Sequence, residues 1–293
     1  MSGIIGPASH LGTGSKMCRW AAYLGPETYL EDIISSPSHS LVAQSHDAHE
    51  AKTRTNGDGF GVAWYGHRSE PGLYRDILPA WSDQNLRSLA RQIRSRLFLA
   101  HVRASTGGLT SRSNCHPFVS GRWSFMHNGQ IGNFDRLRRR LESHLGDELY
   151  TQKHGATDSE LIFLLMLEFG LDNDPVLALT RTVSTIVEEA ICAGVPPFLR
   201  LTAAFSEGNQ LYAIRYATEP SRRRSIRRRL AVRPACAWCR NPLMGKPPTG
   251  WPCQQTASLL FPGRGASRSR LSRGRFPGRR RWRPRGPDAL RNA

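Results

Sequence analysis

The sequence contains no apolar run that approaches the ~20 residues needed to cross a bilayer. Its six cysteines are scattered along the chain, without the dense pairing of a secreted disulfide scaffold. The first 16 residues are rich in Gly and Ser and lack the apolar segment of a secretory signal. These absences argue against a membrane-spanning protein and a disulfide-stapled protein. They indicate a reducing, cytoplasmic setting.

Acidic residues are almost missing from the last part of the chain. Residues 217–293 contain 19 Arg and one Lys but only Glu219 and Asp288, so they account for the whole formal net charge of +18. They also hold many Pro and Gly residues and no hydrophobic periodicity, which is typical of a disordered segment. We expect a disordered tail that is either a frameshift product or a basic arm for nucleic acid. We favour the frameshift, so nucleic acid is not the expected partner.

Residues 18–216 read as one compact α+β domain, preceded by residues 1–17 as a leader or a misassigned start. Segments of strand character cover 59–65, 96–104, 122–127, 199–206 and 210–216. Helical patterns occur at Leu86, Leu89, Ile93 and Leu97, from Asp158 onwards and from Pro175 onwards. Strands at both ends with helices between them predict sheets that are covered by helices.

Cys18 directly follows an internal methionine, in the run Met17-Cys18-Arg19-Trp20. If the mature chain begins at Cys18, one residue carries both a thiol and a free α-amino group. An amine of pKa near ~8 can take the proton from such a thiol and act as its base. An acylated amine cannot, so this chemistry requires that residues 1–17 are absent from the active protein. The alternative is that Cys18 is an ordinary small core residue.

Short polar segments follow Cys18 in a fixed order: HVRAST at 101–106, NCHPF at 114–118, HNGQ at 127–130 and TDSE at 157–160. Each is weak alone. Together with the MCRW start and NGDGFGVAWY at 56–65, they resemble the class II (N-terminal nucleophile) glutamine amidotransferases. The resemblance covers about residues 17–216. It is nearest to stand-alone members such as the γ-glutamyl amidohydrolase of ergothioneine biosynthesis.

The resemblance implies a four-layer αββα sandwich, which would be incomplete at its C-terminus if the chain lacks further strands after Tyr216. It implies that Cys18 attacks the γ-amide of glutamine or of a γ-glutamyl conjugate and forms a thioester. Asn128 and Gly129 match the oxyanion hole, and Arg103 and Asp158 match the groups that bind the α-carboxylate and α-ammonium of the substrate. No metal or organic cofactor is implied. Any ammonia released would pass to a separate enzyme.

Other interpretations of these residues stay open at this point. Asp158 would also serve as a helix N-cap, and Arg103 as a surface charge. His101 and His127 are expected to organise the site or to fill the core, and no role is assigned to His116. Cys236-x-x-Cys239 lacks a second ligand pair, so zinc is not expected. For the whole chain, the alternatives are a nucleic-acid-binding protein, an inactive remnant of the amidase or another N-terminal-cysteine hydrolase. The HNG segment and the Arg103/Asp158 pair argue against the last.

Overall fold

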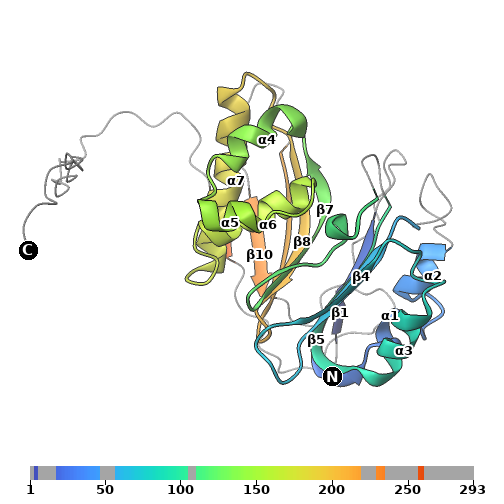
Figure 1. Cartoon of the computed structure of the whole chain (residues 1–293). Coiled ribbons are helices and arrows are strands. Elements are labelled where there is room, and N and C mark those ends of the chain that lie inside the picture. The colour runs from blue at the N-terminus through green and yellow to red at the C-terminus, as the bar shows by residue number, and fades with distance from the viewer. Residues whose placement is uncertain are drawn as a thin grey trace, which may run out of the picture. The chain divides into compact units, whose positions relative to one another are not determined.

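A computed structural model describes residues 3–5, 18–46, 57–104, 110–218, 229–234 and 257–260. The chain divides into two units, Met1–Phe261 and Pro262–Ala293, and every described residue belongs to the first. Within that unit the strands form two antiparallel sheets with helices against them (Figure 1). In these ranges no helix is both long and apolar enough to cross a membrane.

The first sheet is built around two strands that are far apart in the sequence. In spatial order its strands are β1 (Gly3–Ile5), β2 (Arg19–Tyr29), β5 (Arg94–Val102), β3 (Phe60–Trp64) and β4 (Gly72–Asp76). Val102 of β5 is paired with Arg19 of β2 on one side and with Phe60 of β3 on the other. Cys18 and Gly59 directly precede β2 and β3, and Arg103 directly follows β5, so all three lie beyond the paired ends of adjacent strands at one end of the sheet.

The second sheet includes strands from both sides of Tyr216. In spatial order they are β11 (Ala257–Leu260), β10 (Arg229–Pro234), β9 (Leu211–Ala217), β8 (Leu199–Ser206), β7 (Trp123–Ile131) and β6 (Phe118–Ser120). β10 and β11 lie in the basic segment, where β10 pairs with β9 and β11 pairs with β10. A disordered or frameshifted origin for the tail as a whole stays a prediction.

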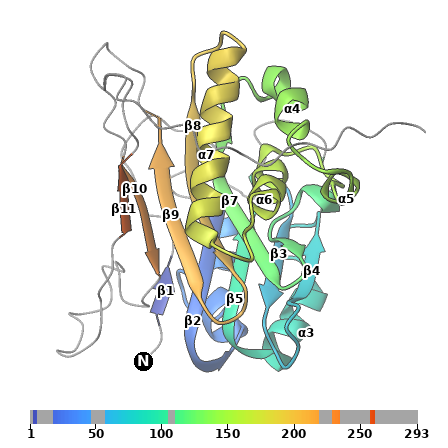
Figure 2. The ribbon, with the colours of Figure 1, turned by 90° about the vertical axis from the view of Figure 1, so that its left-hand side faces the viewer.

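The helices cover the outer faces of the two sheets. They are α1 (Glu31–Ile34), α2 (Leu41–His46), α3 (Gln84–Gln92), α4 (Phe134–Glu142), α5 (Asp147–Thr151), α6 (Asp158–Glu168) and α7 (Pro175–Cys192), with a 3-10 turn at Arg112–Asn114. α1, α2 and α3 pack on the first sheet. α4, α6 and α7 pack on the second, where α6 and α7 lie side by side (Figure 2).

Three separate apolar cores confirm the four-layer αββα arrangement. One lies between the first sheet and its helices, one between the second sheet and its helices, and one between the sheets. Strand alternation produces this pattern: along β5, Phe98 and Ala100 face the helices, whereas Leu97 and Leu99 face the other sheet. Both faces of a strand are thus buried, which explains why β5 reads as a nearly continuous apolar run.

Tyr65 joins the two sheets through its hydroxyl group. Its oxygen lies 2.9 Å from Ser124 Oγ and donates to the carbonyl of Ser206 at 2.7 Å, both in the second sheet. Tyr65 is 5% exposed, and burial raises its pKa to about 12. This polar contact fixes how the facing sheets align inside an otherwise apolar layer.

One predicted helix boundary is wrong, and so is the alternative that Asp158 caps α6, although the predicted helix start at Asp158 is confirmed. The helix predicted from the Leu86 face ends at Gln92, and Leu97 lies in β5, because an apolar helix stripe and a buried strand share residue types. The N-cap of α6 is Thr157, which accepts from the Glu160 N–H, and not Asp158. The helix start at Pro175 is confirmed, with Asp174 as its N-cap.

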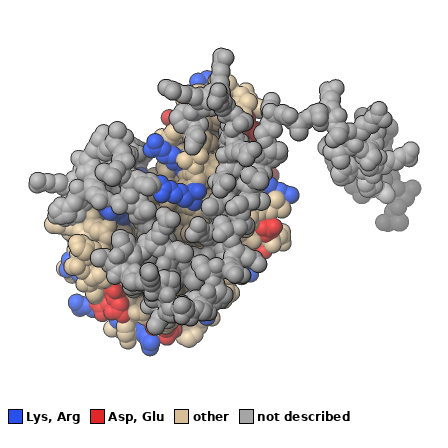
Figure 3. Space-filling model, turned by 180° about the vertical axis from the view of Figure 1, so that it is seen from behind, with Lys and Arg blue, Asp and Glu red and all other residues tan. Residues whose placement is uncertain are grey.

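Charged side chains of both signs are present on the described surface. The face shown in Figure 3 carries Lys and Arg as well as Asp and Glu among its described residues. The described part of this face is therefore not uniformly basic, despite the net positive charge of the whole sequence.

Candidate active site

Cys18 lies directly before β2, where it meets the chain that leaves β5. The backbone N–H of Ala104 points to the Cys18 sulfur at 3.3 Å, and the thiol lies 3.4 Å from the Ala104 carbonyl oxygen. Burial raises the pKa of the Cys18 thiol above its usual range, although the Ala104 backbone contact and the nearby Arg103 guanidinium oppose the rise. The thiol therefore stays protonated near neutral pH, and a base has to take its proton before it can attack.

Arg103 is a buried residue at the same edge of the sheet. Its side chain is 8% exposed, so the alternative that it is a surface charge is wrong. The Arg103 N–H donates to Gly59 O at 2.8 Å, and its guanidinium Nη1 reaches the carbonyl oxygen of Asp58 at 3.4 Å. A buried guanidinium is costly to desolvate, which is why such a group is normally paired or kept for an anionic ligand.

Asn128 brings the second sheet to Cys18. It lies near the end of β7, and its side-chain Nδ2 donates to the carbonyl oxygen of Cys18. Its Oδ1 lies 3.0 Å from His101 Nε2 on β5. The Asn128 carboxamide thus contacts both Cys18, directly before β2, and His101, on β5, which places it beside the thiol-bearing residue.

Gly129 follows Asn128 and occupies a position where no side chain fits. Its φ is +151°, and a Cβ there would collide with the Arg200 carbonyl oxygen and lie 2.5 Å from His127 Nε2. Gly129 is exposed, whereas His127 is buried. The Gly129 backbone is therefore open to solvent at a point where the packing permits only glycine.

Asp158 lies in the first turn of α6 and is tied to the same end of β7. Its Oδ2 accepts from the Ile131 N–H at 2.8 Å, and its Oδ1 lies 3.4 Å from Ser159 Oγ. Ser159 also contacts His127 Nδ1 at 2.9 Å. The structure thus joins Cys18, Arg103 and Asn128 by direct or adjacent contacts, and links Asp158 to them through β7.

A buried polar frame holds the loop that leads into α6. Asn114 Oδ1 accepts from the Ala156 N–H at 2.9 Å, and Glu160 accepts from the N–H groups of His154 and Gly155. Sequence reasoning did not assign these roles to Asn114 and Glu160. Asn114 is the first residue of the NCHPF segment and Glu160 is the last residue of TDSE. Their positions in these motifs were the sequence signal that could have indicated their roles.

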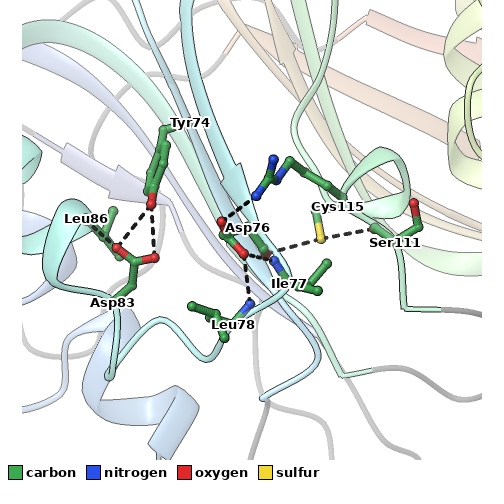
Figure 4. Close-up of polar contacts among 9 residues, drawn as sticks. Tyr74, Asp76, Ile77, Leu78, Asp83, Leu86, Ser111 and Cys115 are labelled. Carbon is green, nitrogen blue, oxygen red and sulfur yellow. Dashed lines mark hydrogen bonds and ion pairs between the residues drawn. The ribbon is translucent and has the colours of Figure 1, made fainter.

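The segment before His116 is anchored to the end of β4, as Figure 4 shows. Arg112 pairs with the Asp76 carboxylate at 2.8 Å, and the Cys115 thiol lies 3.5 Å from the Asp76 carbonyl oxygen. A Cβ on Gly59, whose φ is +112°, would come within 2.6 Å of the Cys115 sulfur. Cys115 is buried and takes part in this packing, whereas Cys192 is exposed.

Three histidines lie buried near Cys18 and Asn128. Burial lowers the pKa of His101 to about 3 and the pKa of His116 well below its usual range. Burial also lowers the pKa of His127, although the Asp158 carboxylate opposes this. All three rings are therefore neutral near pH 7. No cluster of three metal-ligating residues occurs in the described ranges, and Cys236 and Cys239 lie outside them.

Comparison with known proteins gives a family match over most of the chain. The profile described as "Glutamine amidotransferases class-II" matches residues 32–230. A solved structure described as a glutamine aminotransferase class-II domain protein from Silicibacter pomeroyi is 44% identical, with a TM-score of 0.54. It covers 69% of this chain and 78% of its own. The profile match starts after Cys18 and extends beyond Tyr216.

Two curated relatives are similar in sequence. The probable glutamine amidotransferase DUG3 of Saccharomyces cerevisiae is 43% identical over 161 residues, which are 52% of this chain and 45% of that protein. The γ-glutamyl-hercynylcysteine sulfoxide hydrolase of Mycolicibacterium smegmatis is 29% identical over 199 residues, which are 67% of this chain and 78% of that protein. The chain thus spans less than half the length of the yeast relative. With the family profile matched over residues 32–230, the chain belongs to the class II glutamine amidotransferases.

Proposed function

We propose that this protein is an amidase that cleaves the γ-amide of glutamine or of a γ-glutamyl conjugate. The observation that carries the proposal is the meeting of Cys18 and Asn128 beside the buried Arg103 guanidinium. A thiol, an amide donor and a buried cation in one place are what an amino-acid amide requires. The name of the mycobacterial relative, a γ-glutamyl hydrolase, supports the same substrate class.

In the proposed reaction the free α-amine of Cys18 takes the proton from the thiol. The thiolate attacks the carbonyl carbon of the γ-amide, and the resulting tetrahedral intermediate loses ammonia or an amine, which leaves with that proton. Water then attacks the thioester, which releases a γ-carboxylate and restores the thiol. The raised pKa of the Cys18 thiol supports the need for an adjacent base.

We assign the oxyanion hole to the Asn128 side-chain amide and the Gly129 backbone N–H. The Asn128 amide donates to the Cys18 carbonyl oxygen, so a donor points to this region. Removal of one such donor typically costs about 10²–10³ in rate. Asn128→Ala should therefore lower kcat by about that factor.

We assign recognition of the amino-acid end of the substrate to Arg103 and Asp158. A guanidinium binds a carboxylate bidentately, and a carboxylate pairs with an ammonium group. A substrate with a free α-amine and a free α-carboxylate satisfies both. N-acetylglutamine and glutaminamide each lack one of these charges, so both should react poorly. Substrates that differ only in an uncharged substituent on the leaving amine should still react.

The mechanism requires that Cys18 is the first residue of the active protein. In the printed sequence its nitrogen is acylated by Met17, and an amide nitrogen is not a base. Mass spectrometry of active protein should show an N-terminal Cys18. Activity in a protein that retains Met1 or Ser2 at its N-terminus would contradict the mechanism.

The decisive experiment compares a protein translated from Met17 with its Cys18→Ala variant, using glutamine and several γ-glutamyl amides. We expect release of ammonia or amine by the first protein only, and a thioester on the Cys18 peptide in rapidly quenched samples. Cys192→Ala is the matched control, since that thiol is exposed and outside the site. Equal activity in Cys18→Ala would refute the proposal, and no activity in either protein would favour an inactive remnant.

The fate of released ammonia belongs to the same proposal. If glutamine is the substrate, the ammonia would pass to a separate acceptor enzyme. If a γ-glutamyl conjugate is the substrate, hydrolysis itself is the useful reaction. A kcat/KM that is higher for γ-glutamyl amides than for glutamine would favour a γ-glutamyl conjugate as the substrate.

A further inference from the structure

The Asn128 carboxamide has a second contact on the side away from Cys18. Its Oδ1 lies 3.0 Å from Nε2 of His101, while its Nδ2 donates to the Cys18 carbonyl oxygen. His101 is 1% exposed and lies on the face of β5 that looks toward the second sheet. The two contacts together hold the amide from both ends.

The chemistry of these contacts fixes the protonation of the His101 ring. The Cys18 carbonyl oxygen only accepts, so the NH₂ end of the Asn128 amide must face it. The oxygen end then faces His101, and a carboxamide oxygen requires a donor. His101 must therefore carry its proton on Nε2, which leaves Nδ1 as the bare nitrogen.

The surroundings of His101 favour this neutral form. The ring stacks on His116 with centroids 4.4 Å apart and planes inclined by 31°. Burial is the main reason that the pKa of His101 falls to about 3; the hydrogen bond with Asn128 opposes this fall, and the nearby Arg103 charge adds to it. Among the described residues, His101 Nδ1 has no hydrogen-bond partner, so no contact there favours the other tautomer.

We propose that His101 is a positioning residue: as the neutral Nε2–H tautomer it orients the Asn128 carboxamide so that the NH₂ end faces Cys18. The proposal rests on the role assigned above to Asn128. Without this partner the amide is held only by its contact with Cys18, so a rotation by half a turn becomes less costly. The oxygen end would then face the Cys18 carbonyl and any oxyanion, where it repels both. His101 therefore acts through Asn128 and does not touch the substrate.

Kinetics on three variants test this role. His101→Phe keeps an aromatic ring against His116 but removes the donor, so kcat should fall about 10-fold to 100-fold with KM nearly unchanged, less than for loss of the oxyanion donor itself. His101→Gln places an amide NH₂ near the position of Nε2 and should recover kcat to within about fivefold of wild type. His116→Phe is the matched control, because its ring nitrogens have no hydrogen-bond partner in the described part of the chain. It should leave kcat almost unchanged.

A double-mutant cycle separates positioning from a general structural role. If His101 acts through Asn128, adding His101→Phe to Asn128→Ala should cause little further loss of kcat. Independent losses that multiply would overturn the proposal. So would equal loss in His101→Phe and His101→Gln when both proteins fold.

Nitrogen NMR of the histidine side chains gives a readout that needs no activity. His101 should show a proton on Nε2 and none on Nδ1, without titrating between about pH 5 and 8. The Asn128→Ala variant should weaken that tautomer preference. An Nδ1–H tautomer in wild-type protein would overturn the positioning proposal. The expected tautomer in a protein without amidase activity would instead refute the proposed function and leave the orientation of Asn128 in place.

Discussion

The carboxylate of Asp158 accepts a hydrogen bond from the backbone N–H of Ile131 at 2.8 Å. This contact ties the first turn of α6 to the end of β7, two residues beyond Gly129. The N-cap of this helix is Thr157, one residue before Asp158, so Asp158 is not needed to cap it. Its carboxylate is therefore held at the strand end, where Oδ2 accepts from the Ile131 N–H and Oδ1 lies 3.4 Å from Ser159 Oγ.

The first prediction separates the contact of Asp158 with the Ile131 N–H from its proposed contact with the substrate. Asp158→Asn keeps an oxygen for the Ile131 N–H but removes the charge, so KM for glutamine should rise about 10-fold or more while stability stays near wild type. Asp158→Ala should raise KM similarly and also cost about 1–2 kcal/mol of unfolding free energy, because the Ile131 N–H loses its partner. Steady-state kinetics and urea denaturation measure the two effects.

The matched control for this pair is Asp135→Asn. Asp135 lies in the first turn of α4 and is exposed, so it resembles Asp158 in its helix position but not in its contacts. It should change neither KM nor stability measurably. A KM for Asp158→Asn equal to that of Asp135→Asn would remove Asp158 from the substrate site.

The second prediction concerns the space around Gly129. Gly129→Ala places a Cβ against the Arg200 carbonyl oxygen at a φ of +151°, so β7 and β8 have to separate locally. We expect a loss of at least about 2 kcal/mol in stability and of most activity. Gly66→Ala is the control, because a Cβ at Gly66 meets nothing within 4 Å. Thermal unfolding of the two variants checks this, and a Gly129→Ala protein as stable as Gly66→Ala would show that the strands can yield.

The third prediction follows from the raised pKa of the Cys18 thiol. Only the thiolate is alkylated, so in a protein that retains residues 1–17, where the Cys18 nitrogen is not a base, labelling of Cys18 by iodoacetamide should be slow at pH 7 and should accelerate as the pH rises above the usual thiol range. The exposed Cys192 in the same protein is the internal comparison. Peptide mass spectrometry gives both rates. Faster labelling of Cys18 than of Cys192 at pH 7 would mean that a base or cation already holds the thiolate.

The fourth prediction concerns the link between the sheets. Tyr65→Phe leaves the Ser206 carbonyl oxygen and the Ser124 hydroxyl without the buried Tyr65 partner, which should cost about 1–3 kcal/mol in urea denaturation. The wild-type pKa of Tyr65 is raised from 10.0 to about 12, so the folded state holds this proton longer than the unfolded state does. Wild-type stability should therefore fall as the pH rises from 10 towards about 12.

The Tyr65→Phe variant should lack that part of the alkaline decline. Its stability difference from wild type should shrink as the pH approaches about 12. Tyr150→Phe is a suitable control, because Tyr150 is 51% exposed. A difference between wild type and Tyr65→Phe that stays constant from neutral pH to about 12 would contradict the raised pKa.

Much of the fold followed from local patterns in the chain. The apolar runs of β3, β5, β8 and β9 and the start of α7 at Pro175 were predicted near their observed places, because each is a short segment with a clear signal. The end of α3 at Gln92 was not predicted. Leu97 continued the helical stripe of Leu86 and also lay in the strand predicted over 96–104; the structure places it in β5, packed between the sheets.

By itself the sequence determined which residues were available for chemistry: a cysteine behind a methionine, and the HVR, HNG and TDSE segments in order. It could not decide the surroundings of those residues. The carboxamide of Asn128 held between Cys18 and His101 depends on two sheets meeting face to face, and Asp158 bound to Ile131 depends on α6 packing against β7. These contacts join residues that are 27 to 110 positions apart. Such pairings arise from strand register and layer packing, which no local pattern of side chains encodes.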